Sequence, residues 1–89
     1  MFAHEIVLML LFVKGPQETY SYYAKKGEVD HLILNLLDLN AQGYIYVNSG
    51  SWSWSEGPDV PGDLNPLGIK LTRIGELRAG RLVDVFKNR

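Results

Sequence analysis

Cysteine is absent from the 89 residues of this chain. Its absence excludes thiol catalysis and cysteine-bound zinc. It also favours a cytoplasmic location, because small secreted domains commonly depend on disulfides. Long apolar runs are missing as well: the longest, Ile6 to Val13, is far too short to cross a bilayer. No basic cluster precedes this run and no small-residue cleavage site follows it, so we predict neither a signal peptide nor association with a membrane.

Positive charge is scarce in the middle of the chain. Between Gly27 and Ile69 there is no lysine or arginine, whereas the same stretch holds six acidic residues. Residues 1–69 carry three lysines and eight acidic residues, and residues 70–89 carry six basic and two acidic residues. The net charge of −1 is therefore the sum of an acidic segment, residues 1–69, and a basic tail, residues 70–89. A stretch without cations is poorly suited to bind phosphate groups.

Motifs typical of enzymes are missing too. The sequence has no phosphate-binding loop, no dinucleotide fingerprint and no nucleophile elbow. The candidate metal ligands form two adjacent pairs, His4 with Glu5 and Asp30 with His31, and adjacent side chains on a helix point in different directions. We therefore predict that the protein is not an enzyme and holds no metal or cofactor, and we infer no small-molecule ligand.

Apolar periodicity predicts four helices, over 2–14, 19–26, 28–42 and from Thr72 toward Lys87. The helix over 28–42 is the clearest, because its apolar residues share one broad face. They are Val29, Leu32, Ile33, Leu36, Leu37 and Leu39. Gly15-Pro16 and Gly43 are expected to end helices, and Thr19 and Thr72 are expected N-caps. The pair Ala79-Gly80 is a candidate break in the last helix.

Short β-branched and aromatic segments predict strands in the second half. Tyr44 to Val47 reads as a strand, and Asn48-Ser49-Gly50 is a turn signal after which Ser51 to Ser55 is expected to pair back as a hairpin. Residues 56–67 read as a loop and 68–71 as a short strand. The alternation over 51–55 places Trp52 and Trp54 on one side. They either cover the end of the core or form a platform for a partner.

Two segments carry a resemblance to a known family. Leu71-Thr72-Arg73-Ile74-Gly75-Glu76-Leu77 resembles the segment that follows the wing in winged helix-turn-helix regulators of the multiple-antibiotic-resistance and phenolic-acid-decarboxylase kinds. Residues 29–45 resemble their third helix and the strand after it. The resemblance implies an α+β winged helix over residues 1–89 as a single domain, with a three-helix core, a β-hairpin wing and a C-terminal helix. We expect a shared core of Leu10, Val29, Leu32, Leu36, Leu39, Ile45 and Ile69.

The resemblance also implies an alternative function, DNA-binding transcription regulation through the 28–42 helix and the 44–71 wing. In such regulators the third helix enters the major groove, and lysine and arginine supply most phosphate contacts. Here that helix and wing have neither residue. The candidate nucleic-acid contacts are Lys25, Lys26, His31 and Asn35. The charge pattern therefore favours a module that binds protein.

The basic tail is the predicted contact for self-association. In related regulators an extra terminal helix commonly carries the dimer contact, and residues 74–86 lie in that place with more apolar side chains than a solvated helix needs. We predict a homodimer, or a complex with another protein, in which acidic residues of the partner pair with the tail's arginines. The candidate partner-binding residues are Trp52, Trp54, Leu77, Arg78, Arg81, Leu82 and Phe86. The alternative is that the tail folds back on the chain's own first helix.

Overall fold

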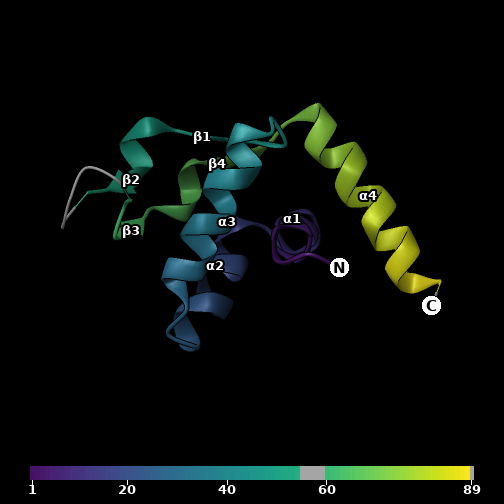
Figure 1. The fold of residues 1–89 in the computed structure, drawn as a ribbon, viewed down its shortest axis with the longest axis horizontal. Helices are drawn as coiled ribbons and strands as arrows, with labels where there is room; N and C mark the ends of the chain where they lie inside the picture. Colours follow the sequence, from purple (N-terminus) through teal and green to yellow (C-terminus); the bar gives the residue numbers. More distant parts are fainter. Residues whose placement is uncertain (55–59, 89) are drawn as a thin grey trace.

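The computed structural model describes residues 1–54 and 60–88. In this part of the chain, helices α1 to α3 come first, short strands follow and helix α4 ends the fold (Figure 1). The helices are α1 Ala3–Val13, α2 Pro16–Lys25, α3 Val29–Ala41 and α4 Arg73–Lys87. The strands are β1 Ile45–Val47, β2 Trp52–Ser53, β3 Asp63–Leu64 and β4 Ile69–Leu71. The predicted α+β class is confirmed, and no helix in the described residues is long and apolar enough to span a membrane.

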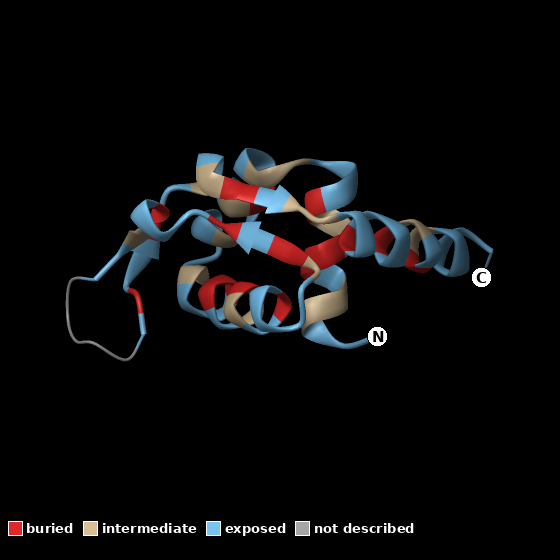
Figure 2. Cartoon of the chain, turned by 90° about the horizontal axis from the view of Figure 1, so that it is seen from above, coloured by how far each residue is buried: buried red, intermediate tan, exposed pale blue. Residues whose placement is uncertain are grey.

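The core forms where α3 meets α1 and the β1–β4 pair (Figure 2). The predicted stripe on α3 is confirmed, since Leu36 is 0% exposed and its neighbours on that face are buried or half-buried. Ile45 and Ile69 join this core as predicted. The prediction for Leu10 was wrong: it is half-buried and lines an open groove, while Val7, Leu8 and Leu11 supply the α1 part of the core. Val29 is also only half-buried at the edge of the cluster.

The junction between α1 and α2 corrects the predicted start of the second helix. Gly15 adopts φ 89 as the N-cap and Pro16 is the first residue of α2. Proline suits this place because its fixed φ matches the first turn and its missing N–H is not needed there. Thr19 is therefore not the cap. It is buried inside the helix, and its hydroxyl donates to the carbonyl oxygen of Gly15 at 2.8 Å.

The strands pair differently from the prediction. β1 pairs antiparallel with β4, with Tyr46 opposite Lys70, and β2 pairs antiparallel with β3, with Trp52 opposite Leu64. The expected hairpin between 44–47 and 51–55 was therefore wrong. Residues 49–51 form a 3-10 turn instead of a hairpin turn, so the chain continues outward and pairs with residues from 63 onward. Ser55 lies outside the described residues.

Helix α4 begins as predicted and is longer than its glycine suggested. The Thr72 hydroxyl accepts from the Gly75 N–H at 3.1 Å and donates to the Gly43 carbonyl oxygen at 2.6 Å. At Gly75, a Cβ would lie 1.8 Å from the carbonyl oxygen of Tyr44, so this close approach requires glycine. The helix continues through Ala79-Gly80 to Lys87. A mid-helix glycine costs only about 1 kcal/mol, which the burial of Ala79 beside it offsets.

Candidate binding surfaces on the last helix

Helix α4 packs against α1 of its own chain. Gly75, Ala79 and Leu82 form the buried side of α4. An ion pair joins the same two helices, in which Arg78 Nη2 donates to Glu5 Oε2 at 2.8 Å. The alternative in which the tail folds back on the first helix is therefore what the structure shows. Leu82, predicted as a partner contact, is used inside the chain.

Glu5 is held in its charged form by this arrangement. Its Oε1 accepts from the backbone N–H of Phe2 at 2.9 Å, and only 12% of its side chain is exposed. The Phe2 N–H and, to a smaller extent, the Arg78 guanidinium lower the pKa of Glu5. Partial burial acts in the other direction and is outweighed.

The side of α4 away from α1 carries a second set of apolar residues. We call Ile74, Leu77, Arg78, Arg81 and Val85 the outer face, since their spacing places them along one side of the helix. Arg78 lies at the edge of this face, and its guanidinium reaches back to Glu5 of α1. Leu77 is 61% exposed, and Ile74 and Val85 are similarly exposed. Together with Tyr44, the first four residues line a recess of about 340 Å³. The recess therefore offers apolar contacts beside two guanidinium groups.

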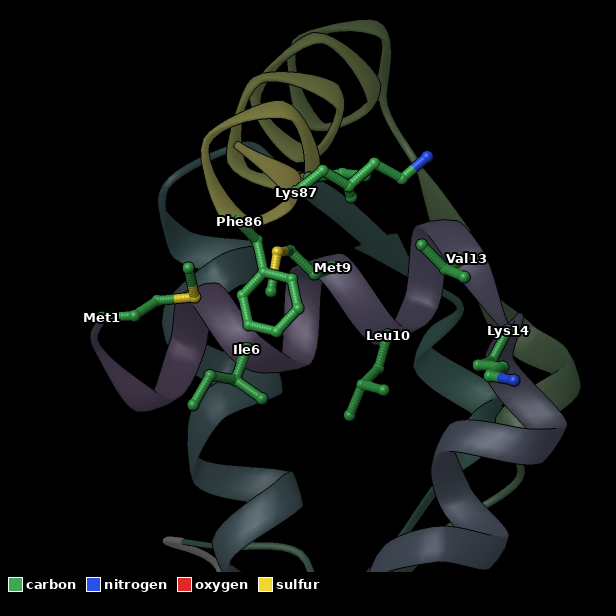
Figure 3. A pocket seen from close by; sticks show the side chains of 9 residues that line it. Met1, Ile6, Met9, Leu10, Val13, Lys14, Phe86 and Lys87 are labelled. Atoms are coloured by element: carbon green, nitrogen blue, oxygen red, sulfur yellow. The ribbon is translucent and has the colours of Figure 1, made fainter. Parts of the chain in front are cut away.

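A groove lies between α1 and the C-terminal part of α4 (Figure 3). Its volume is about 520 Å³, and its sides are Ile6, Met9, Leu10 and Val13 of α1 with Val83 and Phe86 of α4. Figure 3 shows Met1 near one end and Lys14 and Lys87 on the side of Val13. No carboxylate is among the described residues that line it. The sequence prediction assigned Phe86 to a partner contact together with Leu77, but the structure places these two side chains on different sides of α4.

The two tryptophans lie in different surroundings. Trp52 is half-buried and packs against the core cluster, as expected if it covers the end of the core. Trp54 follows β2 and is exposed. The structure therefore does not combine the two indoles into one platform on β2.

The candidate nucleic-acid contacts are partly engaged within the chain. Asn35 Nδ2 donates to the carbonyl oxygen of His31 at 2.8 Å, and His31 Nδ1 lies 3.6 Å from Glu28 Oε2. Lys26 Nζ donates to the Tyr22 hydroxyl at 2.7 Å, which raises the pKa of Lys26. Lys25 is exposed at the end of α2. In the described parts of the chain, no three His, Asp or Glu side chains lie together in a way that could hold a metal ion.

The exposed side of α3 is acidic. Asp30, Leu34 and Asp38 follow each other at four-residue spacing and are all exposed. This spacing places them in one line along the helix, and we call these three residues the acidic face. Its centre is apolar, since Leu34 is 51% exposed.

Comparisons with protein-family models, with curated proteins and with solved structures found no match for this chain.

Proposed function

We propose that this chain is a non-enzymatic winged-helix module that acts by binding protein, in the first place a second copy of itself. The order of three helices, antiparallel strand pairs and a last helix supports the winged-helix assignment. The outer face of α4 carries the binding proposal. Ile74, Leu77 and Val85 remain exposed there although α4 is already packed on α1. A terminal helix that met only water on this side would not need a second apolar face.

The acidic face of α3 is the proposed counterpart on the second copy. It places an apolar side chain, Leu34, between two carboxylates, and the outer face places apolar side chains beside Arg78 and Arg81. Contact between the two would cover apolar surface and give the Arg81 guanidinium a carboxylate in reach, which avoids burying an unpaired charge. Arg78 is already paired with Glu5 of its own chain. A two-fold axis would form the contact twice and close the assembly as a dimer. Charge complementarity would then set orientation and association rate more than affinity.

The alternative proposal is a DNA-binding transcription regulator that uses α3 and the strands of 44–71. Its base-reading candidates on α3 are His31 and Asn35. Asp30 and Asp38 lie on the same exposed side of the helix and repel phosphate. The acidic surroundings support protein binding as the leading proposal.

Light scattering on the intact chain and two single variants tests the proposal. Leu77→Asp places a charge in the outer face, and Phe86→Asp places one on the other side of the same helix. The two side chains are 61% and 60% exposed, so neither change disturbs the core. We expect a dimer for the parent chain and for Phe86→Asp, and a rise of at least about tenfold in the dissociation constant for Leu77→Asp. Leu82→Asp is unsuitable for this comparison, because Leu82 is buried in each copy.

A charge exchange tests the proposed counterpart. Arg81→Glu alone should weaken the dimer, and adding Asp30→Lys and Asp38→Lys should restore it. A parent chain that stays monomeric at high micromolar concentration would refute self-association. A dimer that dissociates only with Phe86→Asp would place the contact in the groove instead.

A further inference from the structure

The groove between α1 and α4 has the composition of a site for an amphiphile. Its sides are apolar along α1 from Ile6 to Val13, and Phe86 of α4 lies beside Ile6 and Met9 (Figure 3). Its cationic side chains are Lys14, which follows Val13 at one end, and Lys87, which extends from α4 toward the same side (Figure 3). We propose that this groove binds the alkyl chain of an anionic amphiphile, a medium-chain carboxylate, with the carboxylate attracted to the lysines on the Val13 side.

Charge complementarity selects this occupant. Both polar side chains that line the groove are lysines, and none of the described lining residues is acidic. An alkyl cation would be repelled at the Val13 end, and a neutral alkane would make no favourable contact with the two ammonium groups. A carboxylate head group is attracted to both ammonium groups, while the alkyl chain of the ligand covers apolar surface that otherwise faces water.

The dimensions of the groove limit the length of the ligand's alkyl chain. Ile6 and Val13 are about 10 Å apart along the helix axis, from the rise per residue, and Met1 extends the apolar surface beyond Ile6. The volume of about 520 Å³ lies within the range of sites for small ligands. Since the groove is open along one side, part of the chain stays in contact with water. Each added methylene should therefore strengthen binding by less than the roughly fourfold expected for full burial.

The groove lies on the other side of α4 from the outer face, so this inference does not depend on the proposed self-association. Ligand binding and dimer formation can therefore be tested separately. Binding of decanoate and failure of the chain to dimerise would leave the inference intact. Dimer formation without decanoate binding would refute the inference and leave the proposed function intact.

Isothermal titration calorimetry with sodium decanoate, octanoate and decyltrimethylammonium bromide tests the inference. All three are used below the concentrations at which they form micelles. We expect decanoate to bind the intact chain at least about tenfold more tightly than decyltrimethylammonium, from two exposed charge contacts, and more tightly than octanoate. Lys14→Gln combined with Lys87→Gln should remove the preference for the anion. The control, Lys25→Gln combined with Lys26→Gln, changes the net charge equally at the C-terminal end of α2 and should keep the preference.

A second variant tests the place of the alkyl chain. Ile6→Asp introduces a carboxylate at a partly exposed position in the groove and should abolish decanoate binding, whereas Leu67→Asp, at an exposed position away from the groove, should not change it. Circular dichroism checks that both variants remain folded. Equal affinity for the anion and the cation, or decanoate binding indifferent to the two groove lysines, would overturn the proposal.

Discussion

Two glycines of α4 provide a test of how this helix is held against the strands. Replacing a helical glycine by alanine normally stabilises a protein by about 1 kcal/mol, because alanine has the higher helix propensity. We expect this gain for Gly80→Ala, because a Cβ there would have no atom within 4 Å in the described structure. Gly75→Ala should act in the opposite direction. Its Cβ would lie 1.8 Å from the Tyr44 carbonyl oxygen and 2.8 Å from the carbonyl carbon, and these are backbone atoms that cannot rotate away.

The size of the difference follows from the same contacts. Overpacking of this kind costs about 1–3 kcal/mol, and the gain in helix propensity applies to both glycines, so Gly75→Ala should be less stable than Gly80→Ala by about 1–3 kcal/mol. For a domain of this size, each 1 kcal/mol moves the midpoint of thermal unfolding by about 4–8 °C. Thermal and urea unfolding followed by circular dichroism would measure it. Equal stability of the two variants would refute the close approach of α4 to Tyr44, and with it the angle at which α4 leaves the sheet.

Three further results are expected. Leu36→Asp buries an unpaired charge at a position that is 0% exposed, so circular dichroism should show an unfolded chain, whereas Leu34→Asp, exposed on the same helix, should stay folded. Fluorescence anisotropy at physiological salt should show only weak, non-specific binding to duplex DNA; sub-micromolar, sequence-selective binding would restore the regulator function. Because its pKa is lowered, Glu5 should stabilise the fold above its unfolded pKa, and this contribution should disappear as the pH falls through the folded pKa. Urea unfolding should therefore show that Glu5→Gln is less stable than the parent chain by under about 1 kcal/mol at about pH 6. This difference should vanish as the pH is lowered to about 3.

The helices that the sequence predicted best have a contrast between two faces. On α3, polar residues alternate with the leucines at helical spacing, so the buried side could be predicted from periodicity, and Gly43 ends the helix with φ 80. The start of α4 could be predicted for a similarly local reason, because Thr72 caps the third residue of its own helix. Contacts of this kind depend on residues within one or two turns. They are therefore readable from a single segment.

The strand pairing could not be predicted in the same way. Strands of two or three residues contain too little alternation to fix a partner. The turn signal at 48–50 favoured a local hairpin, but Asn48 N–H donates to the Gly68 carbonyl oxygen at 3.0 Å and the Ser51 side chain lies against Gly68. These contacts join residues far apart in the sequence. They determine which strands pair, and no signal within either segment of the sequence indicates them.

The groove escaped prediction because of the composition of α1. Every residue from Ile6 to Val13 is apolar, so periodicity alone could not decide which of them face the core. The structure divides the run: Val7, Leu8 and Leu11 enter the core, and Ile6, Met9, Leu10 and Val13 line the groove. We inferred no small-molecule ligand from the sequence because it contains no ligand-binding motif. Lys14 and Lys87 are far apart in the chain, so no local pattern joins them. Only the packing of α4 on α1 brings them to the same end of one groove.

The exposed apolar side of α1 is the strongest physical argument that this groove binds a ligand. A helix that is apolar on all sides is normally buried on all sides. Here the chain's own α2 and α3 pack against α1 on one side, and α4 packs against part of the rest. Phe86 of α4 lines the groove opposite α1 and is itself 60% exposed. If solubility were the only constraint, polar side chains at Ile6, Leu10 and Val13 would cost the core nothing, because these residues do not belong to it. Their apolar character is explained if a ligand binds in the groove and covers these side chains.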